Sequence, residues 1–149
     1  MASKLPAITL KAIGVVRSEI KRPSQGHLQD TVSEIIIDRR LTEALDNLDE
    51  FSHIIFIYWM HRRRGPAPQK VHPMGDLERP LTGVFATRSP DRPNPIGQAT
   101  VRLRQRQGNR LIVAGLDAID GTPVIDIKPY IPGYDSVKKA KTPPWVVKR

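Results

Sequence analysis

The stretch from Ile54 to Met60 reads IIFIYWM, an uncharged run rich in β-branched and aromatic side chains. Such residues favour strands, and a run that is apolar at every position is typical of a strand covered on both faces. The run is far shorter than the ~20 apolar residues needed to cross a bilayer. It therefore predicts the most buried strand of a soluble sheet.

Short strand-like segments lie on both sides of this run, separated by turn residues. One helix is predicted after Asp38, which can cap it, because apolar residues recur with helical spacing from Leu41 to Leu48. Further strands are expected at Ile8–Arg17, Val32–Asp38, Val84–Thr87, Thr100–Gln105, Leu111–Val113 and Val124–Lys128. This pattern predicts a mainly β fold, a single small antiparallel β-barrel with one or two short helices. A doubly wound α/β sheet would need helices between parallel strands, and these are missing.

The composition excludes several kinds of site. The 149 residues contain no cysteine, so disulfides and zinc–thiolate sites are ruled out. The four histidines show no metal-binding spacing, and we expect no metal. The length fits one domain, with a core over about residues 8–137 and a basic tail over residues 138–149. Because no secretory signal or membrane-spanning stretch is found, we expect a cytoplasmic protein.

Positive charge is abundant and clustered. Twenty-four Lys and Arg against 15 Asp and Glu give a net charge of +9, which attracts polyanions such as RNA. The plainer alternative is a solvated basic surface without a partner. Arg102, Arg104 and Arg106 alternate along one predicted strand and are therefore expected to share one face. A further cluster, Arg62–Arg64, lies in a proline-rich connection of a length that is usually functional or disordered.

Two segments contain more charged and polar side chains than packing requires. Gly83–Gly97 reads GVFATRSPDRPNPIG, where three prolines restrict the backbone around two arginines and an asparagine. Leu116–Tyr130 reads LDAIDGTPVIDIKPY, where three aspartates and a lysine lie around a turn. Packing alternatives exist for both segments: a proline-stiffened loop, a simple turn at Asp120-Gly121, and an ion pair between Asp126 and Lys128.

These two segments closely resemble the TrmO family, and the upstream motifs IGVVRS, RPSQG and LDEFSHIIFIYWMHR occur in the family's order. The resemblance covers about residues 8–137. It implies an S-adenosyl-L-methionine-dependent tRNA methyltransferase built on a β-barrel. The implied reaction places a methyl group on N6 of threonylcarbamoyladenosine beside the anticodon, at position 37, and the implied assembly is a homodimer.

The resemblance also implies site residues, carried over motif by motif. Those for S-adenosyl-L-methionine are Gln25, Gly26, His27, His61, Arg62, Arg88, Gln98, Gly115, Leu116 and Asp117. Those for the methyl-acceptor side are Arg92, Asn94, Asp126, Lys128 and Tyr130, with Asp126 or Asp120 as the group that could take the N6 proton. The strand arginines Arg102, Arg104 and Arg106 are expected to contact tRNA phosphates.

Two other functions stay open on the sequence alone. The first is a non-catalytic RNA-binding barrel that uses the arginine-rich strand. The second is a methyltransferase that acts on a different RNA or on a small nucleotide. Binding of the methyl donor discriminates the first from an enzyme, and the identity of the methylated product discriminates the second.

Overall fold

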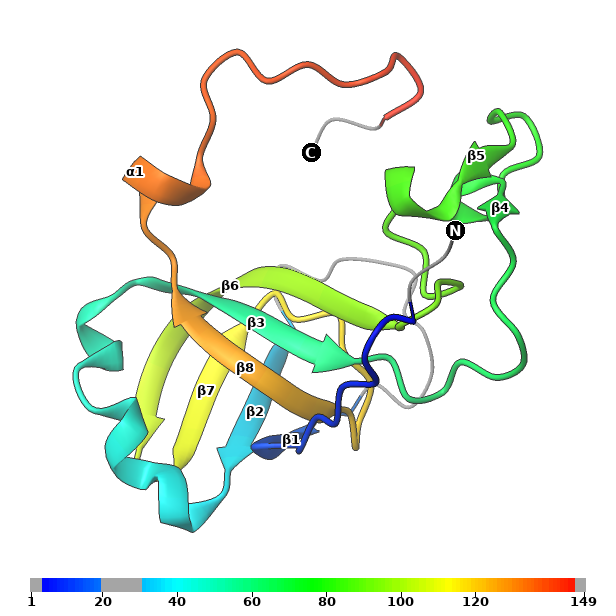
Figure 1. The fold of residues 1–149 in the computed structure, drawn as a ribbon. Coiled ribbons are helices and arrows are strands. Elements are labelled where there is room, and N and C mark those ends of the chain that lie inside the picture. Colours follow the sequence, from blue (N-terminus) through cyan, green and yellow to red (C-terminus); the bar gives the residue numbers. More distant parts are fainter. Residues whose placement is uncertain (1–3, 20–30, 147–149) are drawn as a thin grey trace.

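The computed structural model describes residues 4–19 and 31–146, which form a closed antiparallel barrel in the order β1-β2-β7-β6-β3-β8 (Figure 1). The barrel strands are β1 (Gly14–Arg17), β2 (Val32–Ile37), β3 (His53–Trp59), β6 (Ile96–Gln107), β7 (Arg110–Ala114) and β8 (Pro123–Pro129). The expectation of a mainly β fold with a small antiparallel barrel is confirmed.

Strand β3 lies between β6 and β8 and pairs with both over most of its length. It pairs with β6 from His53↔Arg102 to Trp59↔Ile96, and with β8 from Ile54↔Pro129 to Tyr58↔Val124. Ile54 and Phe56 are fully buried. They pack in the interior with the apolar side chains of the other strands, which include Val16, Ile35, Val101, Leu111, Val113 and Val124. The prediction that residues 54–60 form the most buried strand holds only in part: Ile54, Ile55 and Phe56 are buried, whereas the second half of β3 is half-buried and a larger share of β7 is buried.

Three strand predictions need correction. The first strand begins only at Gly14, because residues 8–12 pair with no strand among the described residues, and Ile8 is 78% exposed. Val84–Thr87 is not a strand, since Val84–Ala86 forms a 3-10 turn (η5). The strand expected at Thr100–Gln105 is longer at both ends, running from Ile96 to Gln107, because the PNPIG motif leads directly into the pairing with β3.

The helix predicted after Asp38 is a 3-10 helix, η2 (Arg39–Leu45), followed by a second short one, η3 (Leu48–Glu50). Asp38 caps η2 as expected, accepting a hydrogen bond from the Arg40 backbone N–H at 3.0 Å. The helical spacing does not continue past Leu45, because Asn47 takes a left-handed conformation with φ of 71°.

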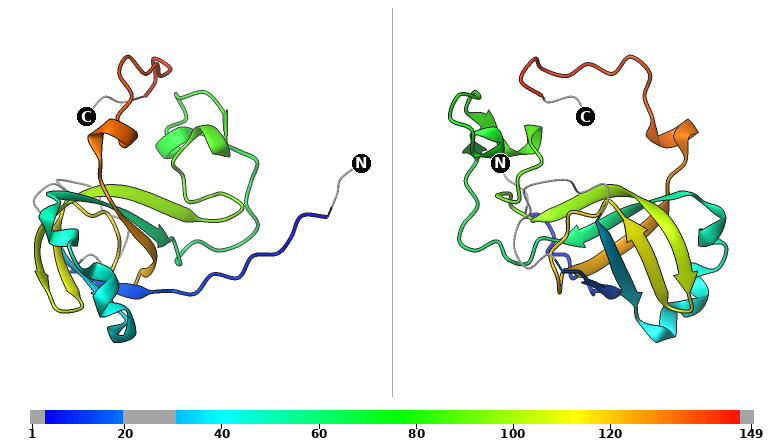
Figure 2. Two further views of the ribbon diagram at one scale, coloured as in Figure 1. Left: turned by 60° about the vertical axis from the view of Figure 1, so that its left-hand side comes forward. Right: turned by 180° about the vertical axis from the view of Figure 1, so that it is seen from behind.

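The long connection from His61 to Leu81 is not structureless. It carries β4 (Lys70–Val71), which pairs with β5 (Thr82–Gly83), and a 3-10 turn, η4 (Pro73–Gly75), lies between them. This small hairpin projects from one end of the barrel, as does the chain that follows α1 (Pro132–Asp135) (Figure 2). None of the helices in the described residues has the length and apolar character needed to span a membrane.

The arginines of β6 do not share one face. A bulge between Leu103 and Gln105 shifts the pairing with β7, so that Arg106 lies opposite the fully buried Leu111. Its guanidinium donates to Asp46 Oδ1 at 2.9 Å and to the Thr42 carbonyl at 3.1 Å. Arg102 and Arg104 remain exposed. The expected alternation of three arginines is therefore wrong at Arg106, which ties β6 to η2.

A close backbone contact at Gly14 gives a test of the barrel closure. A Cβ added at Gly14 would lie 2.3 Å from the Ile36 carbonyl oxygen, so Gly14→Ala must push β1 away from β2. We expect it to lower the free energy of unfolding by about 1–3 kcal/mol in urea denaturation. Gly133→Ala is the control, because nothing lies within 4 Å of a Cβ there. Equal midpoints for both variants would contradict this account.

Candidate functional site

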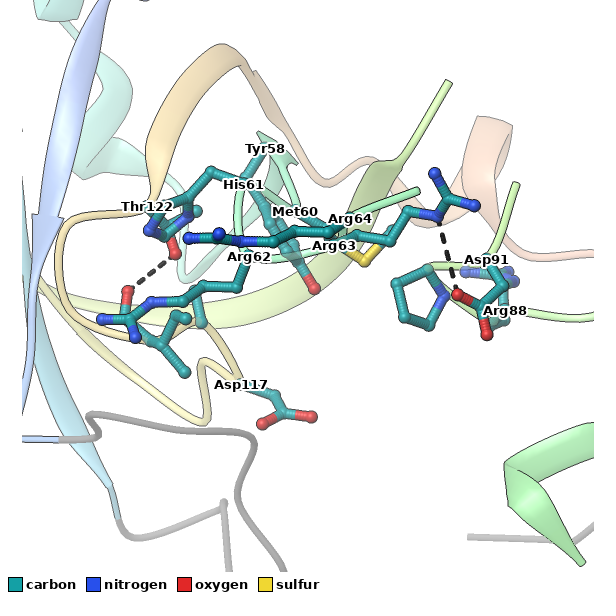
Figure 3. Close-up of a pocket in the computed structure, with 13 residues that line it drawn as sticks. Tyr58, Met60, His61, Arg62, Arg63, Arg64, Arg88, Asp91, Asp117 and Thr122 are labelled. Carbon is teal, nitrogen blue, oxygen red and sulfur yellow. Dashed lines mark hydrogen bonds and ion pairs between the residues drawn. The ribbon is translucent and has the colours of Figure 1, made fainter. Parts of the chain in front are cut away.

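A cavity of about 420 Å³ lies where β3 leaves the barrel (Figure 3). Three segments form its walls: the end of β3 with the residues after it, the turn at residues 88–91, and the loop between β7 and β8. Its lining residues are Tyr58, Met60, His61, Arg62, Arg63, Arg64, Arg88, Pro90, Asp91, Asp117, Ala118, Ile119 and Thr122. The volume suits a small organic molecule.

Tyr58 connects this cavity to the barrel core. Its ring stacks on Phe56, two residues earlier on the same face of β3, with centroids 4.9 Å apart and planes 17° apart. Opposite it in the register lies Gly97, where an added Cβ would come within 2.4 Å of the Tyr58 Cζ atom. Glycine is therefore required at position 97 for the ring to lie flat across β6.

The Tyr58 hydroxyl is electrostatically coupled to two other cavity residues. Burial raises the pKa of the Tyr58 phenol, and the Asp117 carboxylate raises it further, whereas the Arg88 guanidinium acts in the opposite direction. The phenol therefore stays protonated at neutral pH and presents an O–H group among charged neighbours.

The proline-rich wall is held by its own polar groups. Arg92 Nη1 donates to the carbonyls of Thr87 and Ser89, both at 3.0 Å. The Asp91 backbone N–H donates to Ser89 Oγ at 3.0 Å. The wall is joined to the chain after β3 by Arg63, whose Nε lies 3.5 Å from Asp91 Oδ1 (Figure 3). This network leaves Arg88 exposed and lining the cavity.

The opposite wall is a turn with a buried base. Leu116 and Ala118 are buried in the barrel, so the intervening Asp117 is exposed and lines the cavity. The turn closes through Thr122 Oγ1, which donates to the Ile119 carbonyl at 2.7 Å. Asp120 Oδ1 accepts the Ser18 backbone N–H at 3.0 Å. This agrees with the turn interpretation of Asp120-Gly121.

His61 contributes a buried polar atom to the cavity. Its Nδ1 is buried, and within residues 4–19 and 31–146 it makes no hydrogen bond. A buried ring nitrogen is normally hydrogen-bonded, so this one is suited to contact a bound molecule. The other ring nitrogen faces Gly121, where an added Cβ would lie 3.9 Å away.

Four of the ten residues expected to hold the cofactor line the cavity together: His61, Arg62, Arg88 and Asp117. Leu116 is fully buried in the core, and Gly115, with φ of 89°, donates its N–H to the Thr31 carbonyl. Gln98 is exposed on β6, paired with Ile57 in the register, and does not line the cavity. Gln25, Gly26 and His27 lie outside the described residues.

The residues expected on the acceptor side do not line this cavity. Asp126 and Lys128 form an ion pair of 2.8 Å on β8, as the packing alternative predicts, and this pairing raises the pKa of Lys128. Tyr130 lies at the other end of β3, with its ring edge-on to His53. Asn94 is exposed beside the proline-rich wall. Sequence reasoning missed Tyr58, because the position of Gly97 opposite it follows only from the strand register.

The fold and cavity together define a small β-barrel protein with an arginine-lined cavity at one end. In the part of the chain that the structure describes, no group of three His, Asp or Glu residues could hold a metal ion. Over residues 15–136 the chain matches the family described as the tRNA-methyltransferase O N-terminal domain, and it belongs to that family. The expected family is thereby confirmed.

Several relatives support this assignment. An S-adenosyl-L-methionine-binding protein of Archaeoglobus fulgidus is 46% identical over 134 residues, covering 87% of this chain and 94% of the relative. The crystal structure of TrmO from Pseudomonas aeruginosa is 33% identical, with a TM-score of 0.73, over 91% of this chain. Another crystal structure of TrmO is 35% identical with a TM-score of 0.76. The chain spans 62% of the length of both solved structures, and 37% of a second Archaeoglobus fulgidus relative.

The raised pKa of Tyr58 predicts a pH dependence of stability. The unfolded chain ionises this tyrosine near its ordinary pKa of about 10, whereas the folded protein keeps it protonated to higher pH. The stability contribution is therefore intact below about pH 10 and is lost as the pH rises through the folded pKa. Urea denaturation at increasing pH should show a steeper loss for the natural protein than for Tyr58→Phe. Parallel curves would contradict this interpretation.

Proposed function

We propose that this protein is an S-adenosyl-L-methionine-dependent tRNA methyltransferase acting on N6 of threonylcarbamoyladenosine at position 37. The observation that carries the proposal is the gathering of His61, Arg88 and Asp117 around one cavity floored by Tyr58. These three side chains come from separate segments and were expected, from the family resemblance, to hold the cofactor. The family's description as a tRNA methyltransferase supports the class of reaction.

The chemistry of the cavity fits the methyl donor. Arg88 offers a guanidinium, which pairs well with the carboxylate of the methionine part. Asp117 offers a carboxylate for ribose hydroxyls, and the buried Nδ1 of His61 has no other partner among the described residues. The Tyr58 ring provides a flat apolar floor for a ring or a cation. When bound, S-adenosyl-L-methionine supplies a sulfonium-activated methyl group.

The protein's main task in this mechanism is positioning. Holding two reactants in line can contribute about 7–11 kcal/mol to a transfer reaction, without a metal or a covalent intermediate. The stiff proline-rich wall and the buried base of the 115–122 turn supply that rigidity. An anticodon loop is already single-stranded, so presenting its base requires little unstacking. Asp120 accepts a hydrogen bond from Ser18 and Asp126 pairs with Lys128. The N6 proton released by the transfer passes to one of these two carboxylates or to water.

A homodimer is part of the proposal. Large apolar side chains are exposed on the β4–β5 hairpin, on η5 after it and on the segment from α1 onward: Met74 is 78% exposed, and Leu77, Phe85, Tyr134 and Val137 are similarly uncovered. Exposed apolar side chains gathered on projecting segments are typical of protein interfaces.

Nucleoside mass spectrometry tests the reaction directly. The purified protein is incubated with S-adenosyl-L-methionine and tRNA that carries or lacks the threonylcarbamoyl group. The proposal expects a mass increase of one methyl group on the modified adenosine only. Methylation of a different nucleoside would instead favour the alternative substrate, and binding of RNA without any methylation would favour the non-catalytic barrel.

Arg88→Ala should weaken binding of S-adenosyl-L-methionine. Loss of a charge-assisted hydrogen bond of about 1.5–3 kcal/mol corresponds to roughly a 10- to 150-fold higher dissociation constant in calorimetry. Arg39→Ala is the matched control, because Arg39 is an exposed arginine on η2, outside the cavity. Unchanged affinity in the Arg88 variant would remove this residue from the donor site.

The arginines of β6 should divide into two classes in RNA binding. Replacing Arg102 and Arg104 by alanine should weaken tRNA binding and reduce the salt dependence, by roughly 0.7 in log–log slope for each single-strand phosphate that these two arginines neutralise. Arg106→Ala should leave that slope unchanged and destabilise the fold by about 1–3 kcal/mol, since its guanidinium is bound within the protein. A reduced slope for Arg106→Ala would show that all three arginines face the RNA.

A further inference from the structure

The chain after β8 leaves the barrel in a direction that α1 fixes. Asp135 Oδ2 accepts the Ile131 backbone N–H at 2.7 Å, and the Ser136 N–H donates to the Pro132 carbonyl at 3.2 Å. Residues 136–144 are exposed throughout, and their ribbon stands away from the barrel, on the same side as the β4–β5 hairpin (Figures 1 and 2). The side chains of this segment therefore face solvent and add little to the core.

Three lysines of this segment have no acidic partner among the described residues. The ion pairs found there involve other side chains, and none is formed by Lys138, Lys139 or Lys141. No acidic residue occurs in residues 136–146, and the preceding Asp135 is engaged at the start of α1. The positive charge of the segment is therefore uncompensated, and such a charge attracts a polyanion.

Lys139 has a backbone conformation that favours glycine. Lys138 and Lys139 form a turn, in which the φ of Lys139 is 58°. Residues other than glycine and asparagine are uncommon at left-handed positions, because their Cβ atom crowds the backbone. The turn itself therefore does not explain the choice of lysine. What this side chain adds at the bend is a positive charge.

The segment begins beside the exposed arginines of β6. The Tyr130 N–H donates to the His53 carbonyl at 3.1 Å, and His53 lies opposite Arg102 in the register. The chain therefore leaves β8 at the end of β3 where Arg102 and Arg104 lie exposed. The cavity lies at the other end of β3, and because this strand has seven residues its two ends are roughly 20 Å apart.

We propose that Lys138, Lys139 and Lys141 bind backbone phosphates of the duplex stem that closes the anticodon loop. The inference rests on the proposed function for the identity of the RNA. An RNA strand that runs from the cavity past Arg102 and Arg104 has covered roughly 20 Å, so its next phosphates belong to the stem. Lysines suit this contact, because flexible ammonium groups bind phosphates without reading the base sequence.

The test compares two triple variants that lose the same charge. Lys138→Gln/Lys139→Gln/Lys141→Gln removes it from the proposed stem contact, whereas Lys4→Gln/Lys11→Gln/Arg39→Gln removes it from exposed residues before β1 and on η2. Circular dichroism checks that both variants fold. Fluorescence anisotropy measures the affinity for an anticodon stem–loop RNA and for its single-stranded loop alone, at several salt concentrations.

We expect the first variant to bind the stem–loop at least about 10-fold more weakly than the natural protein. Its log–log salt slope should be smaller by roughly 0.9 for each stem phosphate that a lysine neutralises, whereas the control variant should stay within about twofold in affinity. Both variants should bind the single-stranded loop as the natural protein does, because the loop alone does not reach the lysines.

Lys139→Gly separates the charge from the fold. Glycine adopts the left-handed conformation readily, so the thermal midpoint of this variant should equal or exceed that of the natural protein. Its salt slope for the stem–loop should nevertheless be smaller by roughly 0.9. An unchanged slope together with an unchanged midpoint would remove Lys139 from the RNA contact.

Three results overturn the inference: equal losses of stem–loop affinity in the two triple variants, equal losses for stem–loop and loop in the first variant, or a changed oligomeric state in light scattering with unchanged RNA affinity. These measurements do not require turnover. A protein that binds the stem–loop as expected but methylates no nucleoside overturns the proposed function alone. A protein that methylates the RNA, and whose first variant binds the stem–loop as well as the natural protein does, overturns this inference alone.

Discussion

The stack of Tyr58 on Phe56 is the contact on which the ligand-binding end of this barrel depends. Phe56 is fully buried in the core, so the Tyr58 ring that stacks on it has a rigid support. Gly97 gives that ring the room to lie across β6, because any side chain there would overlap it. The cavity floor is thus a continuation of the hydrophobic core, and core packing and ligand geometry cannot be changed independently at this point.

Around that floor, hydrogen bonds and an ion pair fix some charged side chains of the walls in place, while other charged side chains face the cavity. Arg92, Arg63 and Asp91 are engaged in holding the proline-rich wall, whereas Arg88 faces the cavity. On the other side, burial of Leu116 and Ala118 presents Asp117. The same arginine-rich sequence therefore contains both structural and exposed guanidiniums. Net charge alone would have assigned them one role.

Much of the barrel follows from local sequence, and its exceptions have identifiable causes. Strand β3 was expected within a residue of its observed ends, because a continuous apolar run leaves little choice. Residues 8–13 were overassigned, since strand propensity does not report whether a partner strand is available. The bulge at Leu103–Gln105 has no local signal, and it reverses the side on which Arg106 lies. Four cavity residues, His61, Arg62, Arg88 and Asp117, were reached through the family resemblance, while Tyr58 needed the three-dimensional register with Gly97.

The two ends of the segment at residues 61–95 are held close together, and this affects how much the length of the segment can vary. The Met60 N–H donates to the Pro95 carbonyl at 2.7 Å, and Arg63 contacts Asp91, so the chain leaves and re-enters the barrel at nearly one point. The loop-closure entropy of whatever lies between rises only slowly with its length. The length of the segment that carries the β4–β5 hairpin can therefore change at little entropic cost while the barrel mouth that it leaves from keeps its shape.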